Sequence, residues 1–479
     1  MSDLYISRLT NLFQQYFHLC PSNIEPLPQA GSDRRYYRLS HDNIRVIGAI
    51  NQDVLENDTF INLSRHFKSK GIAVPQVYIQ SEDRIAYLQE DLGQVSLYSL
   101  VKDKPFTAEV ENLYKKTLAA LVRLQIDGAD NFNFTNCYPV QVFDRTSMFW
   151  DLNSFKYYFA RPLRIMFHEP SLQKDFHKLT DWLLKEPLQF FMMRDCQARN
   201  VMIQNGEPVF IDFQGGRKGA MQYDVASLLW QAGAQIPMNK RFELFDYYMY
   251  LVQSRIPNLS RLAFTNRFHG YLLIRMLQVL GAYGFRGLIE GRSHFIESIP
   301  LALKNIDWFM KNVELPIKLP EIYSILEKLI QHPQFQPQPW QTAEKKLLVR
   351  INSFSYKRGL PTDPTGNGGG FIFDCRGILN PGRYESYRSQ TGKDSGVIQF
   401  LKTKSQVDTF LAGVFKTIDI NIQTYLARGF ENLQINFGCT GGQHRSVYCA
   451  EATKNYIERK YQVQVVLHHI EQEITNKLS

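Results

Sequence analysis

The apolar residues in the first 95 positions mix the spacing of strands with that of a helix. Residues 36–39 and 43–50 alternate as two strands that pair with each other, and residues 86–90 form a further strand. Between them, residues 54–70 show the spacing of an amphipathic helix, and Gly71 provides its stop signal. This stretch therefore predicts a small lobe of strands and one helix, residues 1–95.

Helical spacing dominates the next part of the chain, from Thr107 to about Leu329. Two short apolar segments, residues 190–193 and 209–213, interrupt it. A small mixed lobe followed by a large helical lobe is the plan of a kinase. The pattern therefore predicts an α+β bilobal, protein-kinase-like fold whose helical lobe spans residues 96–330.

A proline- and glutamine-rich segment then separates this fold from the rest of the chain. Three prolines fall within seven residues of it, which excludes a helix or a central strand and indicates a linker, residues 331–344. Strands alternate with helices after it, which predicts a small α/β domain over residues 345–479. The expected strands are residues 347–351, 370–374, 433–437 and 463–467, and the expected helices are residues 406–428 and 447–461.

The composition is that of a soluble globular protein, with 44% hydrophobic and 21% charged residues. No apolar run approaches the ~18 residues that span a bilayer, and no signal peptide is expected at the start, so we expect no membrane partner. The six cysteines are scattered without a C-x-x-C pair, which argues against a disulfide framework and a zinc site. A reducing cytoplasm is the simplest location.

The positive charge is concentrated towards the C-terminus. The 18 Lys/Arg and 11 Asp/Glu of residues 345–479 give +7, which leaves about +2 of the total +9 for the preceding residues. A basic domain suits an anionic partner, such as a phosphorylated metabolite, RNA or an acidic protein. A solvated basic face is the alternative.

One loop carries the spacing that phosphoryl transfer requires. Asp195 is followed five residues later by Asn200, and Asp212 stands at the end of the next apolar strand. Phosphoryl transfer needs a carboxylate that orients the acceptor hydroxyl and ligands that hold Mg²⁺ against phosphate oxygens. We therefore predict Asp195 as the catalytic residue and Asn200 and Asp212 as Mg²⁺ ligands, while Asp224 is expected to brace the catalytic loop.

The segment from Asp195 to Leu229 resembles aminoglycoside phosphotransferase-like kinases, and in particular the anomeric cell-wall sugar kinases that act on N-acetylmuramate and N-acetylglucosamine. Residues 29–38, 88–93 and 275–281 are similar to further motifs of that family, and the resemblance covers residues 4–329. It implies an ATP-dependent phosphotransferase with a small sugar as acceptor. It also implies that the ATP phosphates are covered by Ser32, Asp33, Arg34 and Arg35, and that the adenine meets the backbone at Gln89, Glu90 and Asp91.

Two positions depart from the pattern of protein-kinase-like enzymes. Met193 stands where the catalytic loop usually begins with His, and residues 45–50 lack the strand lysine that holds the phosphates. Arg34 or Arg35 could supply the missing charge, since a guanidinium group suits phosphate. If neither does, the domain would bind a nucleotide without turnover.

A glycine-rich loop between a strand and a helix forms a second candidate site. Backbone amides of such a loop and the start of a helix attract anions. The pattern also fits the loop of cysteine phosphatases, with Cys439 as nucleophile, Arg445 as phosphate ligand and Asp363 or Asp374 as general acid. The loop consists of Cys439, Thr440, Gly441, Gly442, Gln443, His444, Arg445 and Ser446.

Residues 351–361, 373–381 and 391–394, together with this loop, resemble the C-terminal domain of the RNase adapter protein family (RapZ-like). In that family the domain senses an amino-sugar phosphate and binds small RNA. The resemblance implies a ligand pocket from Thr440 to Ser446 with Asp374 and Arg376. The Walker-type G-x-x-x-x-G-K-[ST] motif of the family's N-terminal half is missing from the chain, which places the RNA-adapter role in question.

Two functions therefore stand side by side. The first is an ATP- and Mg²⁺-dependent kinase of a small sugar or amino sugar, with a C-terminal domain that binds a phosphorylated metabolite. The second is a regulatory nucleotide-binding adapter whose basic C-terminal domain binds RNA or a protein.

Overall fold

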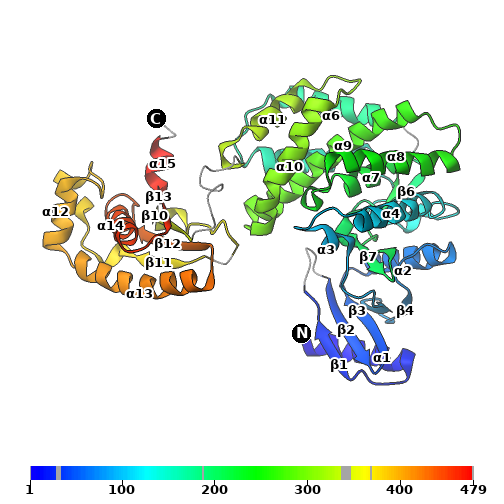
Figure 1. Cartoon of the computed structure of the whole chain (residues 1–479), viewed down its shortest axis with the longest axis horizontal. Helices are drawn as coiled ribbons and strands as arrows, with labels where there is room; N and C mark the ends of the chain where they lie inside the picture. Colours follow the sequence, from blue (N-terminus) through cyan, green and yellow to red (C-terminus); the bar gives the residue numbers. More distant parts are fainter. Residues whose placement is uncertain (1, 29–33, 186–187, 336–346, 367–368, 477–479) are drawn as a thin grey trace. The chain divides into compact units, whose positions relative to one another are not determined.

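The computed structural model describes residues 2–28, 34–185, 188–335, 347–366 and 369–476 (Figure 1). The chain forms two compact units. The first comprises residues 1–290 and 297–335, and the second comprises residues 336–479 with 291–296. Each unit has its own hydrophobic core.

An antiparallel five-stranded sheet, of order β1-β2-β3-β5-β4, forms the small lobe of the first unit. The pairing of β2 with β3 and the strand at residues 86–90 agree with the expected pattern. Asp53 begins the helix α2 (Val54–Ser69) by accepting a hydrogen bond from the backbone of Glu56. The strands are β1 (Asn23–Pro26), β2 (Arg35–His41), β3 (Ile44–Ile50), β4 (Val77–Gln80) and β5 (Ala86–Glu90).

A second helix in this lobe, α1 (Ser2–Phe17), was not predicted. Its residues Leu9, Leu12 and Phe13 are fully or almost fully buried, and they pack with Leu39 and Leu88 of the sheet. These three residues occupy positions i, i+3 and i+4, which lie on one face of a helix, so the sequence contained the signal for this element. This helix covers one face of the sheet and completes the core of the small lobe.

The larger lobe is mainly helical (Figure 1). Helix α9 packs against α5 and α7, and α4 packs against α8. The short strands β6 (Phe190–Met192), β7 (Val201–Gln204), β8 (Glu207–Phe210) and β9 (Arg217–Gly219) form two small sheets. The helices are α3 (Leu97–Val101), α4 (Ala108–Ile126), α5 (Arg145–Phe155), α6 (Glu169–Leu183), α7 (Met221–Leu229), α8 (Met238–Arg255), α9 (Arg261–Tyr283), α10 (Ser293–Asn312) and α11 (Pro320–Ile330).

One segment is more apolar than the sequence analysis indicated. The helical run Arg261–Ile289 contains an 18-residue window of mean hydropathy 1.3, long and apolar enough to cross a membrane by length and composition alone. Within the structure, 56% of that window is buried. Because α9 packs against two other helices, its apolar character is explained by its place in the core of the lobe.

The second unit is built on a parallel four-stranded sheet, of order β11-β12-β10-β13. The strands are β10 (Leu348–Ser355), β11 (Phe371–Asp374), β12 (Asn432–Cys439) and β13 (Gln464–His469), and the helices are α12 (Ser395–Lys404), α13 (Val407–Arg428), α14 (Arg445–Lys460) and α15 (Ile470–Asn476). Helix α14 contacts three of the strands.

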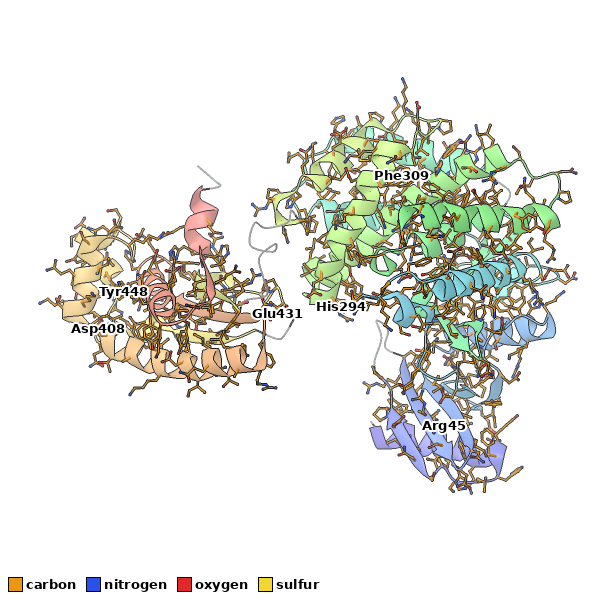
Figure 2. The ribbon with its side chains drawn as sticks, viewed as in Figure 1. Arg45, His294, Phe309, Asp408, Glu431 and Tyr448 are labelled. Atoms are coloured by element: carbon orange, nitrogen blue, oxygen red, sulfur yellow. The ribbon has the colours of Figure 1, made fainter. Side chains whose placement is uncertain are left out.

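In Figure 2, Asp408 marks the first turn of α13, a helix that packs on the core of this unit. The buried residues of α13 recur at helical intervals of three and four: Val407, Leu411, Val414, Ile418 and Ile422. The helix α12, which the sequence did not predict, adds Val397 and Leu401 to the same core. The architecture is therefore an α+β two-lobed unit and a small α/β unit, as the sequence predicted.

Candidate functional site

The three polar residues predicted for catalysis lie together in the first unit. The side-chain amide of Asn200 donates to Asp195 Oδ2 at 3.2 Å and to Asp212 Oδ2 at 3.3 Å. Asp195 and Asn200 belong to the loop between β6 and β7, and Asp212 follows β8. Two strands that pair as a hairpin therefore bring both carboxylates to one amide group.

The turn that carries Asp195 is held by Asp224 of α7. Its carboxylate accepts hydrogen bonds from the backbone N–H groups of Met193, at 2.7 Å, and Arg194, at 3.0 Å. Arg194 adopts a left-handed backbone conformation, with φ of 76°. That conformation is rare outside glycine and needs support from its surroundings. Asp224 has the bracing role that its position in the sequence suggested.

The side chains of this turn are used for packing and ion pairing. Met193, at the position where a histidine is usual, is fully buried in the hydrophobic core. The guanidinium group of Arg194 binds the carboxylate of Asp151 and the hydroxyl of Tyr223, and it lies 4.8 Å from the centre of the Phe143 ring. Met193 therefore anchors the turn by packing, and Arg194 anchors it by ion pairing.

The two carboxylates provide a charge distribution that fits a divalent cation. Although part of Asp212 faces solvent, burial of its carboxylate and the nearby charge of Asp195 raise the pKa of Asp212. Asp212 also has a left-handed φ of 61°. No group of three or more His, Cys, Asp or Glu residues arranged for a metal occurs in the described residues. Mg²⁺ commonly binds to one or two protein oxygens and to phosphate and water for the rest, and Asp212 and Asn200 fit that requirement.

Two arginines that the sequence analysis did not assign to the site contact Asp195. Arg275 of α9 donates to Asp195 Oδ1 at 3.0 Å, and Arg199 donates to Oδ2 at 3.2 Å. Burial opposes ionisation, but the charges of Arg275 and Arg199 outweigh it and lower the pKa of Asp195. A charged residue within the apolar run of residues 271–280 is the signal that could have identified Arg275, because such residues are rarely buried without a partner.

Arg34 and Arg35 have opposite environments. Arg34 is almost fully buried, and its Nη2 atom lies 3.2 Å from Glu56 Oε2 on α2. Its Nε atom has no hydrogen-bond partner among the described residues, and its charge acts on Asp212. Arg35 is exposed and lies 5.9 Å from the centre of the Tyr5 ring. Ser32 and Asp33 lie outside the described residues.

Glu56 is held in place from both sides. Asn51 donates to Glu56 Oε2 at 2.6 Å, and the helix that carries Glu56 packs through Phe60 onto Phe213 with 4.9 Å between ring centroids. Phe213 is fully buried and directly follows Asp212. The helix α2 thus links the Arg34–Glu56 pair to the residue beside Asp212.

The three residues predicted to meet the adenine lie at the end of β5. Asp91 binds the guanidinium group of Arg38 on β2, with distances of 2.6 and 3.2 Å. Glu90 lies 3.5 Å from Lys68, and the side-chain oxygen of Gln89 has no hydrogen-bond partner among the described residues. The side chain of Asp91 therefore ties the end of β5 to β2.

The residues predicted for the second site gather at one edge of the parallel sheet. Carboxyl ends of parallel strands lie at the same edge, and the register places Ser355 opposite Cys439 and Asp374 opposite Gly438. Thr440 and Gly441 are exposed at this edge, whereas Cys439 is buried. The sulfur of Cys439 accepts a hydrogen bond from the backbone of Gly442 at 3.2 Å.

The loop is anchored by its own polar side chains. Gln443 donates to the carbonyl groups of Arg388 and Gln390, and a ring nitrogen of His444 lies 2.8 Å from the carbonyl oxygen of Tyr387. The hydroxyl of Ser446 lies 3.2 Å from the sulfur of Cys439. These contacts use Gln443, His444 and Ser446 to shape the loop.

Arg445 connects the glycine-rich loop to a neighbouring segment of the chain. It is almost fully buried, and its Nη1 atom donates to the carbonyl groups of Arg376 and Ile378, each at 2.9 Å. Arg376 in turn binds the carboxylate of Asp374 and stacks at 4.1 Å from the centre of the Tyr356 ring. Arg445 therefore joins the glycine-rich loop to the segment that carries Asp374 and Arg376.

The first unit has the fold and the loop arrangement of a kinase-like phosphotransferase. Residues 23–250 match the phosphotransferase enzyme family (APH), and residues 347–473 match the RapZ C-terminal domain. The chain thus contains an N-terminal APH phosphotransferase domain and a RapZ C-terminal domain, as the sequence predicted.

Relatives and solved structures resemble parts of the chain. A protein of Fervidobacterium nodosum described as a nucleotide-binding protein is 31% identical over 37% of this chain and 65% of its own length. A protein of Thermosipho africanus with the same description is 38% identical over 26% of this chain and 42% of its own. The chain therefore spans less than two thirds of each of these relatives.

One similar solved structure is a thermostable mutant of aminoglycoside phosphotransferase APH(4)-Ia. It is 16% identical in sequence, its TM-score is 0.43, and the match covers 63% of this chain and 98% of that one. The choline kinase of Cryptosporidium parvum is 12% identical, with TM-score 0.45, and covers 68% of this chain and 100% of its own.

The position of Asp224 predicts a pH-dependent stability. Burial raises its pKa to about 6, against the two backbone N–H groups that favour the charged form. The pKa of Asp224 in the folded state lies above its value in the unfolded chain. Its contribution to the free energy of unfolding is therefore full below about pH 4 and is lost as the pH rises through 6, which lowers that free energy by about 3 kcal/mol. Urea unfolding from pH 4.5 to 7 should show the wild type losing stability relative to Asp224→Asn. A difference that is independent of pH would contradict this assignment.

Proposed function

We propose that this protein is an ATP- and Mg²⁺-dependent phosphotransferase that phosphorylates a hydroxyl group of a small sugar or amino sugar. The observation that carries the proposal is the convergence of Asp195, Asn200 and Asp212 within hydrogen-bond distance. Phosphoryl transfer depends on positioning and on charge stabilisation rather than on covalent help from the protein. A carboxylate beside a cation site supplies both.

Each residue of the site has a separate task in this proposal. Asp195 accepts a hydrogen bond from the acceptor hydroxyl, orients its oxygen and takes its proton as the bond to phosphorus forms. Asp212 and Asn200 would hold Mg²⁺, which supplies positive charge to the phosphate oxygens. Since Arg275 and Arg199 keep Asp195 ionised, Asp195 acts mainly by orienting the hydroxyl.

Arg34 is the group that we assign to the nucleotide phosphates. Arg34 lies in the small lobe beside Asp212 and pairs with Glu56 on α2. Its Nε–H group has no hydrogen-bond partner among the described residues. A buried guanidinium group with free donor capacity fits a phosphate oxygen. Arg34 thereby replaces the lysine that β3 lacks.

Substitution of the catalytic carboxylate tests the reaction. Asp195→Asn should lower kcat by roughly 10²-fold or more, the low end of general-base effects, while Mg·ATP still binds. Asp212→Ala should instead weaken Mg·ATP binding, because it removes a charged cation ligand. Steady-state kinetics with a panel of free sugars and nucleotide titration separate the two effects. Near-normal turnover in Asp195→Asn would exclude this role.

The neighbouring arginines offer a matched pair of variants. Arg34→Gln should raise the KM for ATP by roughly tenfold or more, because a charge-assisted hydrogen bond to phosphate is lost. Arg35→Gln serves as the control, since Arg35 is exposed, and its KM should stay within about twofold of the wild type. Equal effects of both substitutions would contradict the assignment of Arg34.

We also propose that the C-terminal unit binds a phosphorylated metabolite, with an amino-sugar phosphate as the candidate. The exposed backbone of Thr440 and Gly441, the start of α14 and the guanidinium group of Arg376 lie on one edge of the sheet, where they can meet a phosphate. Six free cysteines agree with a reducing cytoplasm as the place of action.

Ligand binding to the full-length protein tests this second site. Glucosamine 6-phosphate at millimolar concentration should raise the melting temperature of the C-terminal transition, and Arg376→Gln should weaken the binding by roughly tenfold. Arg428→Gln, at the end of α13, is the matched control. If calorimetry shows no binding of a phosphorylated sugar, the sensor role fails, and RNA binding becomes the function to test against the basic charge of this unit.

A further inference from the structure

Arg275 reaches the catalytic carboxylate from the interior of the helical lobe. It lies in the central part of α9, its side chain is 8% exposed, and its Nη2 atom lies 3.0 Å from Asp195 Oδ1. Its Nη1 atom donates to Gln278, one turn along the same helix. Both terminal nitrogens are thus engaged, so the guanidinium group is fixed before any acceptor arrives.

Arg199, four residues after Asp195, donates to the other oxygen of the same carboxylate. It belongs to the catalytic loop itself, its Nη2 atom lies 3.2 Å from Asp195 Oδ2, and its side chain is 52% exposed. Asn200 and Gln197 also donate to Asp195. All of these partners are hydrogen-bond donors, and two of them are cations.

The charge balance around Asp195 follows from these contacts. Two guanidinium groups surround one carboxylate, so the trio of Asp195, Arg199 and Arg275 carries a net positive charge. Arg194, the residue before Asp195, is paired with Asp151 and leaves this balance unchanged. Asp212 is assigned to the cation that accompanies ATP. An acceptor that bears an ammonium group beside its reactive hydroxyl therefore meets arginines rather than a free carboxylate.

We propose that Arg275 is a positioning residue for Asp195 and that Arg275 and Arg199 together make the acceptor site selective for uncharged or acidic hydroxyl compounds over amines. This inference rests on the proposed phosphotransferase function and narrows its acceptor from any small sugar or amino sugar to those without a free amine. Like charges a few ångströms apart repel measurably even near solvent, so a single ammonium group is enough to discriminate.

Three sugars that differ at one substituent test the selectivity of the full-length wild type: glucose, glucosamine and glucuronate, at about pH 6.5, where the amine is protonated. The kcat/KM for glucosamine should be at least roughly tenfold below that for glucose, and the gap should narrow at high ionic strength. Transfer to glucose and glucosamine with equal efficiency overturns the inference and leaves the proposed function standing. Transfer to none of the three, with Mg·ATP still bound, overturns both.

Variants assign the selectivity to the two arginines. Arg199→Gln, at a half-exposed position that tolerates substitution, should narrow the gap between glucose and glucosamine by roughly threefold or more. Arg275→Lys keeps the positive charge, but a lysine cannot bind Asp195 and Gln278 in the geometry of a guanidinium group. It should therefore preserve the difference in kcat/KM between glucose and glucosamine while lowering kcat more than it changes KM. Arg275→Gln should lower kcat and narrow the gap as well.

A third arginine provides the control. Arg261 lies at the start of the same helix and pairs with Asp246 on the surface. Arg261→Gln should leave kcat and the ratio of kcat/KM between glucose and glucosamine unchanged. If Arg199→Gln and Arg275→Gln both leave the ratio of kcat/KM values at the wild-type level, the arginines do not set the selectivity and the inference is wrong. Loss of kcat without a change in that ratio would reduce Arg275 to a structural role.

Discussion

The two hydrogen bonds from the backbone of Met193 and Arg194 to the buried carboxylate of Asp224 hold the turn that carries Asp195 in its shape. Without them, the backbone N–H groups of Met193 and Arg194 would lose these partners in a turn whose left-handed conformation at Arg194 needs support. The direction of Asp195 follows from that turn, and the distances from Asp195 to Asn200 and Arg275 follow from its direction. One buried carboxylate thus determines where the side chains of the candidate site lie, and its raised pKa reflects the energetic cost of burying its charge.

The sequence identified the parts of the site that lie close together along the chain. Asp195, Asn200 and Asp212 fall within 18 residues, and the apolar segments on both sides indicate the strands that bring them together. Arg275 contacts Asp195 across a separation of 80 residues. No local pattern specifies such a contact, since it depends on how α9 packs against α5 and α7. The same limit applies to Arg34 and Glu56, which become partners only when α2 packs on the sheet.

Periodicity predicted most elements, and its failures have physical reasons. The helices α2, α13 and α14 were predicted within a few residues of their observed bounds, because each buries one regular stripe of side chains. The helix α9 is apolar on several sides because other helices surround it, so its pattern resembles a membrane segment as much as a core helix. The helix α1 was not predicted, although its apolar residues have helical spacing.

The two arginines Arg275 and Arg445 show how far a residue type can indicate a role. Both are almost fully buried, and both stand near a group predicted to bind phosphate or to transfer it. Arg275 meets the carboxylate of Asp195, so its charge is compensated by the residue that we propose as the catalytic one. Arg445 donates to two carbonyl groups, so it holds a loop in shape with hydrogen bonds that a neutral donor of the same length could also make. The partners of each arginine therefore separate the two cases. Arg275 shares its charge with a carboxylate from a distant part of the chain, whereas Arg445 fixes two backbone carbonyl groups and keeps a buried Nε–H without a partner among the described residues.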